Sequence, residues 1–387
     1  MIKYVERKGT DCVKWDGLME TFGAEDLLPL WVADMDFMAD DHIIQAMRDY
    51  VEAGVPGYYK VKDSYLDSFI DWEKNEHRLL LNKEWIRFTP GVVTGFNFAI
   101  NVLTKPGDAV IVTTPVYYPF LNAVRNNERK LITSEMTREN GRYYIDFEDF
   151  ESKIEENDVK AFIFCSPHNP VSRVWSTGEI TRILDICRRN NVAVISDEIH
   201  HDLIFGGFTH VPTLSLAEEG DRIIMLTAAS KTFNIAGLQN SFAVIKNDEL
   251  RAAWDRFTTG INVTRGNPLG YIAVEAAYRY GKDWLKEVRD IIYANYEYVR
   301  EIFAAELPDV VLTPLEGTYL AWADFGKQIS PVTLQKFMQN RCGLAFDYGS
   351  WFGGGKSDSF IRINLATSRE NIETMVRRIT EGFNGKA

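Results

Sequence analysis

The sequence predicts an α/β fold in which a large domain, built on a mostly parallel sheet covered by helices, is joined to a smaller α/β domain. Three observations support this prediction. From about residue 90 to 270, short apolar runs alternate with amphipathic helical patterns. The last part of the chain repeats the order strand, helix, strand, helix. A length of 387 residues is also more than one ordinary core contains.

Four apolar runs are the expected strands of the large domain: 109–112, 161–164, 192–195 and 223–226. Each is short and almost continuously apolar, as in strands that are buried on both faces of a parallel sheet. Between the second and third runs, Ile180, Ile183, Leu184 and Cys187 recur at helical spacing. Ser176 and Thr177 precede them as candidate caps, so this segment is expected to be a crossover helix.

The C-terminal part begins with a long helical pattern over about 275–310. It continues with a strand at 318–323, a helix at 334–341, a strand at 360–365 and a helix at 370–382. We therefore expect a large domain of residues 41–275. We expect a smaller domain that combines residues 1–40 with 276–387, and a long helix shared between the two.

Composition and charge exclude several classes of protein. Hydrophobic residues at 45% and charged residues at 25% are typical of a soluble globular protein. A net charge of -12 disfavours binding to nucleic acids or anionic membranes. No secretory signal or run of about 20 apolar residues is present, so a cytoplasmic protein is expected. The four scattered cysteines, and the His200-His201 pair without further ligands at helical spacing, predict no metal site.

Chemically useful side chains follow three of the apolar runs. Asn169 follows the second run, Asp197 the third and Lys231 the fourth. Each alone has a plain explanation, as a turn residue, a helix cap or a surface charge. However, each interval between them fits one helix and one return strand, and functional groups of such sheets gather at the carboxyl ends of the strands. The sequence thus predicts an amide, a carboxylate and an amine at one edge of the sheet.

Three segments carry a resemblance to a known family: Trp31–Phe37, Ser196–Asp202 and Ser230–Leu238. Over essentially its whole length, the chain resembles the fold-type I pyridoxal-phosphate enzymes of the class I/II aminotransferase superfamily. It looks most similar to the cystathionine β-lyase (C-S lyase) branch, the PatB/MalY-like enzymes. The resemblance implies a seven-stranded type of large sheet, pyridoxal 5'-phosphate as the cofactor, and a homodimer with shared active sites.

The resemblance assigns roles to the residues at the strand ends. Lys231 would attach to the cofactor aldehyde and then remove the α-proton of the substrate. Asp197 would keep the ring nitrogen protonated. Asn169 and His200 would hydrogen-bond the ring hydroxyl, and Tyr117 would stack on the ring, where the alternative is a core aromatic.

Further roles concern the phosphate and the substrate. Gly91–Gly95 precedes an apolar helical pattern, so Val93 and Thr94 would bind the phosphate through backbone N–H groups, assisted by Ser230. The chain departs from many relatives in having Ala228 and Gln239 where they have serine and arginine.

Arg362 would bind the substrate α-carboxylate, and an outward-facing strand arginine is the alternative. Asp34 is a second candidate for substrate binding. Tyr58 resembles a tyrosine that these enzymes lend to the neighbouring subunit's site, where it would be both catalytic and substrate-binding.

The resulting hypothesis is a pyridoxal-phosphate-dependent C-S β-lyase that eliminates a thiol from an amino acid and yields pyruvate and ammonia. An aminotransferase would use the same residues, so this alternative stays open. A regulatory binding protein on the same fold is an alternative from another class.

Overall fold

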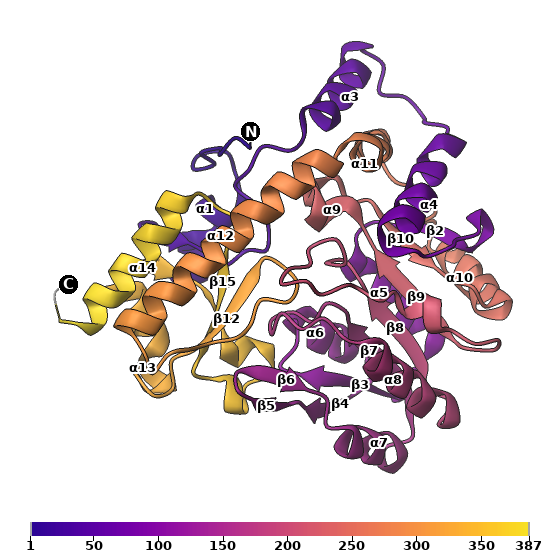
Figure 1. The fold of residues 1–387 in the computed structure, drawn as a ribbon. Helices are drawn as coiled ribbons and strands as arrows, with labels where there is room; N and C mark the ends of the chain where they lie inside the picture. The colour runs from indigo at the N-terminus through magenta and orange to yellow at the C-terminus, as the bar shows by residue number, and fades with distance from the viewer. Residues whose placement is uncertain (1, 386–387) are drawn as a thin grey trace.

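A seven-stranded sheet forms the centre of the computed structural model, which describes residues 2–385 (Figure 1). Neighbouring strands follow the order β2-β10-β9-β8-β7-β3-β4. Their bounds are β2 Ile86–Thr89, β3 Ala109–Thr114, β4 Lys130–Glu135, β7 Val159–Cys165, β8 Ala193–Asp197, β9 Ile223–Thr227 and β10 Ser241–Val244. Only the pairs that β10 makes with β9 and β2 are antiparallel. The predicted mostly parallel sheet is thus confirmed.

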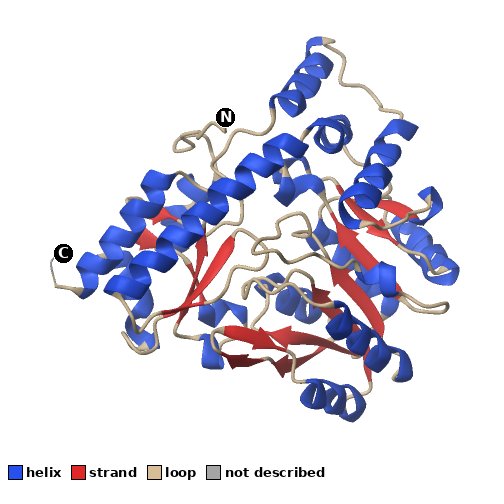
Figure 2. Ribbon diagram, in the orientation of Figure 1, coloured by secondary structure: helices blue, strands red, loops and turns tan. Residues whose placement is uncertain are grey.

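Helices cover both faces of this sheet, which explains its continuously apolar strands. In β7, Phe162 and Phe164 belong to one hydrophobic core, whereas Ala161 and Ile163 belong to another. The first core includes residues of α7 (Phe147–Glu156) and α8 (Thr177–Arg189), and the second includes residues of α5 (Val92–Leu103), α6 (Tyr118–Asn126) and α10 (Asp248–Gly260). In Figure 2 the strands of the sheet lie among these helices.

The predicted crossover helix is α8. Ser176 is its N-cap and forms a capping box with Glu179, in which each side chain accepts a hydrogen bond from the other residue's backbone N–H. Thr177, the other candidate cap, is the first helical residue. The predicted apolar stripe of this helix is buried.

A smaller antiparallel sheet has the strand order β11-β12-β15-β14, with bounds Val311–Leu312, Leu320–Asp324, Phe360–Asn364 and Asp347–Tyr348. α12 (Lys282–Glu306) and α14 (Arg369–Phe383) lie side by side next to it (Figure 1). Near the N-terminus, β1 (Leu28–Pro29) pairs in parallel with β13 (Leu344–Ala345). The predicted strands and helices of this part are confirmed, and the exact domain boundaries stay a prediction.

The long helix predicted over 275–310 is wrong in one respect, because the chain forms two helices there. α11 (Pro268–Tyr280) ends at Gly281, and α12 begins at Lys282. A Cβ atom on Gly281 would lie 2.4 Å from Cε1 of Phe233 and 2.7 Å from the carbonyl oxygen of Ala277. Only glycine therefore fits where the two helices meet the buried Phe233 ring.

The remaining elements are short or peripheral. They are α1 Val13–Asp16, α2 Leu18–Phe22, α3 Asp41–Glu52, α4 Asp63–His77, β5 Thr137–Glu139, β6 Arg142–Tyr144, α9 Ala229–Thr232 and α13 Pro331–Lys336, which continues as a π-helical turn, Phe337–Arg341. Short 3₁₀ turns lie at Lys83–Trp85, Thr213–Leu216, Ala236–Leu238, Gly349–Phe352 and Gly355–Ser357. Within residues 2–385, no helix combines the length and the apolar character that crossing a bilayer requires.

Candidate active site

A cavity of about 300 Å³ lies where the carboxyl ends of β7, β8 and β9 meet the N-terminus of α5. The sheet order makes these three strands neighbours, so the residues that follow them converge. Eight of the predicted site residues line the cavity: Val93, Thr94, Tyr117, Asn169, Asp197, His200, Ser230 and Lys231. The predicted meeting of an amide, a carboxylate and an amine is thus present in the structure.

Lys231 stands on α9, the single helical turn that directly follows β9. Its Nζ donates a hydrogen bond to the carbonyl oxygen of Ala33 at 2.6 Å. Burial lowers the pKa of Lys231 to about 8, although the nearby Asp34 carboxylate opposes this shift. A larger fraction of this amine is therefore neutral near pH 7 than of a lysine in solvent.

Asp197 is the last residue of β8 and is buried. Its Oδ1 accepts a hydrogen bond from the backbone N–H of Ile199 at 3.1 Å. Burial raises the pKa of this carboxyl to about 7, and Glu198 adds to the shift. The negative charge of Asp197 is thus only weakly stabilised by the chain itself, and a cationic partner in the cavity would stabilise it further.

His200 and Tyr117 contribute the aromatic surface of the cavity. Burial and the nearby Lys231 hold the pKa of His200 well below its usual range, which keeps the imidazole neutral. Within the described residues, 2–385, its buried Nδ1 has no hydrogen-bond partner. Tyr117 is half-buried: it packs against the second hydrophobic core and also lines the cavity, and its backbone N–H donates to the carbonyl oxygen of Asn169 at 3.0 Å.

The N-terminus of α5 closes one end of the cavity. Gly91 is its N-cap with φ +92°, and the first residues of the helix are Val92, Val93 and Thr94. The first backbone N–H groups of a helix have no intrahelical acceptor, so this end of the cavity suits an anion. Ser230 and Gln239 also line this cavity.

Arg362 points inward from β15, and only 2% of it is exposed. Its Nη1 donates to Oδ1 of Asn169 at 3.1 Å, and its Nη2 donates to the carbonyl oxygen of Trp31 at 2.9 Å. Nη2 also pairs with the carboxylate of Asp347, whose pKa burial raises to about 6. The alternative of an outward-facing arginine is excluded by this placement.

Three predicted site residues are not part of the cavity lining: Arg362, which contacts the lining residue Asn169, together with Asp34 and Tyr58, which lie outside the cavity. Asp34 lies beside it, where its Oδ2 accepts a hydrogen bond from Arg7 at 2.7 Å. Tyr58 lies in the segment between α3 and α4 and is fully exposed. Figure 1 shows this segment at the periphery of the molecule. The roles of Asp34 and Tyr58 stay predictions.

Sequence reasoning missed several groups at this site. Tyr319 is buried and its hydroxyl donates to the same Ala33 carbonyl oxygen that Lys231 contacts, at 2.7 Å. Asp347 pairs with Arg362, and Cys165 lines the cavity as a buried free thiol. Of these three, only Cys165 had a signal in the sequence, because it directly follows the second predicted strand, 161–164. Tyr319 and Asp347 come from separate segments of the C-terminal part.

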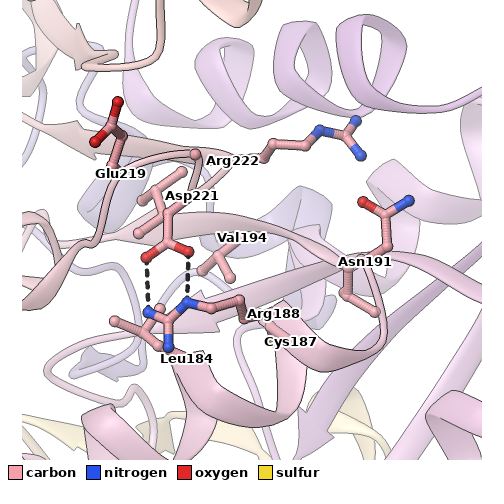
Figure 3. Close-up of a pocket in the computed structure, with 11 residues that line it drawn as sticks. Leu184, Cys187, Arg188, Asn191, Val194, Glu219, Asp221 and Arg222 are labelled. Atoms are coloured by element: carbon pink, nitrogen blue, oxygen red, sulfur yellow. Dashed lines mark hydrogen bonds and ion pairs between the residues drawn. The ribbon is translucent and has the colours of Figure 1, made fainter.

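A second cavity, of about 220 Å³, lies at the opposite edge of the sheet (Figure 3). Its lining includes residues at the amino ends of β8 and β9. Arg188 Nε and Nη2 each donate to one carboxylate oxygen of Asp221, both at 2.9 Å. The pair joins α8 to the turn before β9, so its arrangement indicates a structural role.

Comparison with known proteins agrees with this geometry. The model of the family described as aminotransferase class I and II matches residues 25–379. The chain is 38% identical to the cystathionine beta-lyase PatB of Bacillus subtilis (strain 168) over 380 residues, or 97% of this chain and 98% of that protein. It is 31% identical to Protein MalY of Escherichia coli (strain K12) over 374 residues, which cover 96% and 95% of the two chains.

Solved structures show the same relationship. Cystalysin from Treponema denticola, which contains a pyridoxal 5'-phosphate cofactor, superimposes with a TM-score of 0.95 at 35% identity, covering 100% of this chain and 98% of that chain. The PLP-bound C-S lyase from Staphylococcus hominis gives a TM-score of 0.92 at 30% identity, with 98% and 97% covered. The chain therefore belongs to the class I and II aminotransferase family of fold-type I pyridoxal-phosphate enzymes, in the branch that contains the cystathionine β-lyases.

Proposed function

We propose that this enzyme is a C-S β-lyase that acts on cystathionine or a related cysteine thioether and releases a thiol, pyruvate and ammonia. One observation carries the proposal: the Lys231 amine and the Asp197 carboxylate face one cavity, and Arg362 approaches it from the smaller sheet. Relatives named for cystathionine β-lyase and C-S lyase activity support the choice of substrate class.

The residues of the cavity fit pyridoxal 5'-phosphate, the cofactor of this family. Asp197 is a carboxyl whose pKa burial raises to about 7, and His200 Nδ1 is a buried nitrogen without a partner among residues 2–385. The N-terminus of α5 provides N–H groups for the phosphate. When bound, the cofactor supplies an electron-accepting ring that makes the α-proton of an amino acid acidic.

The chain itself has three tasks in this reaction. Arg362 binds the substrate α-carboxylate and thereby fixes the orientation of the α-carbon. Lys231 Nζ, whose pKa is lowered by burial, takes the α-proton. The electron pair of the C–H bond then becomes a C=C bond while the C–S pair leaves on sulfur, and water converts the released enamine into pyruvate and ammonia.

Incubation of the purified holoenzyme with L-cystathionine tests the proposal. We expect equal amounts of pyruvate and free thiol, measured with lactate dehydrogenase and a thiol reagent. Lys231→Ala should lose turnover by several orders of magnitude, whereas Lys246→Ala, at an exposed lysine after β10, should keep it. Absence of pyruvate and thiol with active cofactor-loaded protein would reject the lyase assignment.

The aminotransferase alternative predicts a different product balance. Nitrogen would then pass to an added oxo acid, and no ammonia would be released. Assay of ammonia with and without an oxo acid therefore separates the two activities. Turnover that requires an oxo acid would favour the aminotransferase.

We also propose that the enzyme is a homodimer and that Tyr58 acts in the partner's active site. Residues 51–58 are all exposed, and they include the apolar side chains of Val51 and Val55. Burial of these apolar side chains against a second copy of the chain would be energetically favourable.

A mixed dimer tests the assignment of Tyr58. The variants Tyr58→Phe and Lys231→Ala should each be impaired alone. A refolded equal mixture should recover about a quarter of wild-type activity, because half of the dimers then hold one complete site of two. A mixture no more active than its components would place Tyr58 outside the partner's site.

A further inference from the structure

Four ionisable side chains meet in a buried cluster behind the cofactor cavity. α4 contributes Glu73 and His77, which are four residues apart and share one face of the helix. The loop after β8 contributes His201 and Asp202, which directly follow His200 of the active site. The exposed fractions of the four side chains are between 1% and 7%.

The geometry of Glu73, His77 and His201 is that of a ligand set. One donor atom from each lies within 4.8 Å of the other two. Nε2 of His201 is 3.4 Å from Oε1 of Glu73 and 3.3 Å from Oδ2 of Asp202. Ligand atoms bound at about 2.0–2.1 Å around a tetrahedral zinc ion are separated by about 3.3–3.4 Å, so the spacing between His201 and Glu73 fits such an ion.

The contacts of His201 show which of its ring nitrogens faces the carboxylates. Its Nδ1 is 2.8 Å from Oγ1 of Thr227, and that hydroxyl is also 3.4 Å from the carbonyl oxygen of Glu198, to which it donates. Nδ1 of His201 is thus engaged by Thr227, which leaves Nε2 as the ring nitrogen that faces the carboxylates of Glu73 and Asp202.

Buried carboxylates are stabilised by a positive charge beside them. Among residues 2–385, Oε1 of Glu73 and Nε2 of His201 are both buried without a hydrogen-bond partner. A metal ion can bind several such donors at once, which a single proton cannot.

Neighbouring groups hold the ligands in position. Oδ1 of Asp202 is 2.7 Å from Nε2 of His77 and accepts a hydrogen bond from Trp72 Nε1 at 2.9 Å. Carboxylates that orient ligating imidazoles in this way are typical of metal sites. The adjacent Glu198 is already paired with His210 at 2.7 Å and is not needed as a ligand.

We propose that Glu73, His77 and His201 bind one divalent transition-metal ion, with Zn²⁺ preferred for a set of two imidazoles and one carboxylate. The ion would join α4 to the loop that follows Asp197 and carries His200. Thr232, next to Lys231, donates to Oδ2 of Asp202 at 2.6 Å, so the site would also support the cofactor lysine. The sequence predicts no metal here because the ligands come from segments far apart in the chain.

Metal content tests the site without any need for turnover, so the result does not depend on the proposed reaction. Tag-free holoenzyme is freed of metal with a chelator, incubated with Zn²⁺ and separated from unbound ion by gel filtration. We expect about one zinc per chain and a higher melting temperature than for the metal-free holoenzyme. Cobalt substitution should give the visible d–d bands of a four-coordinate ion. Zinc content near zero in the folded wild-type protein would overturn the proposal.

Variants locate the ion. Glu73→Gln and His201→Asn should each lose the bound zinc. His42→Asn is the matched control, because His42 forms a similar contact with Asp40 at 2.8 Å but is 62% exposed. Full zinc content in a folded His201→Asn variant would place the ion elsewhere and would also overturn the assignment. If either variant fails to fold, the zinc content and cobalt spectrum of the wild-type protein decide the question.

Discussion

At the scale of single residues, Asp197 is placed for cofactor chemistry at a cost to stability. Burial raises its pKa from 3.8 to about 7, so the folded chain retains a proton that the unfolded chain has already lost. Its contribution to stability is therefore present at low pH and is lost as the pH rises from about 4 to 7. Above that range the chain without cofactor holds a poorly compensated buried charge.

Asp197→Asn should consequently stabilise the cofactor-free protein while it abolishes turnover. At about pH 8 we expect the free energy of unfolding to rise by about 2–4 kcal/mol, since each pKa unit corresponds to about 1.4 kcal/mol. The difference should shrink as the pH falls toward about 4. Urea denaturation at both ends of this range measures it, and a less stable Asn variant at pH 8 would contradict the electrostatic account.

The contribution of Lys231 to stability changes with pH in the opposite direction. Its pKa is lowered from 10.5 to about 8, so between these values the unfolded chain binds more protons, and the lysine's contribution to stability rises with pH. The neutral amine is also the form that attacks the cofactor aldehyde.

The rate at which the cofactor-free protein captures pyridoxal phosphate should therefore rise with pH and level off near pH 8. An ordinary exposed lysine would not level off until above about pH 10. Stopped-flow absorbance over this range measures the rate. A rate that keeps increasing tenfold per pH unit beyond pH 9 would show that the burial of Lys231 does not set its reactivity.

At the scale of secondary-structure elements, local patterns predicted much of the fold but not where long-range contacts interrupt it. The strands β3, β7, β8 and β9 follow from apolar runs, and the start of α8 follows from its cap residue. The requirement for glycine at Gly281, between α11 and α12, does not follow from local patterns, because it comes from the ring of Phe233 in a distant segment.

Gly281→Ala tests that contact. The new Cβ would lie 2.4 Å from a ring that is fully buried beside Trp72 and Tyr278, so we expect a loss of about 1–3 kcal/mol in stability. Gly178→Ala in α8 is the control: nothing lies within 4 Å of its Cβ, so the substitution should be neutral or slightly stabilising. Thermal denaturation of both variants measures the difference. Equal melting temperatures would mean that the Phe233 ring can move aside without a loss of stability.

At the scale of the whole molecule, the active site joins parts that the sequence keeps apart. The order of β7, β8 and β9 predicted that Asn169, Asp197 and Lys231 meet, since parallel neighbours place their carboxyl ends together. The approach of Arg362 and the contact of Lys231 with Ala33 depend on how the N-terminal segment lies between the two sheets. Neither periodicity nor caps specify that arrangement, and only the family resemblance pointed to Arg362.

Because the cavity is built from both sheets and the N-terminal segment, cofactor binding should stabilise the whole chain. At a free cofactor concentration of about 100 times Kd, we expect about 2.7 kcal/mol of stabilisation relative to the cofactor-free protein. Differential scanning calorimetry with and without pyridoxal phosphate measures the gap in melting temperature. Lys231→Ala should narrow it by removing the attachment point, whereas Tyr58→Phe, outside the chain's own cavity, should leave it unchanged. An unaltered gap in Lys231→Ala would mean that binding at the phosphate and ring, rather than attachment at Lys231, provides the stabilisation.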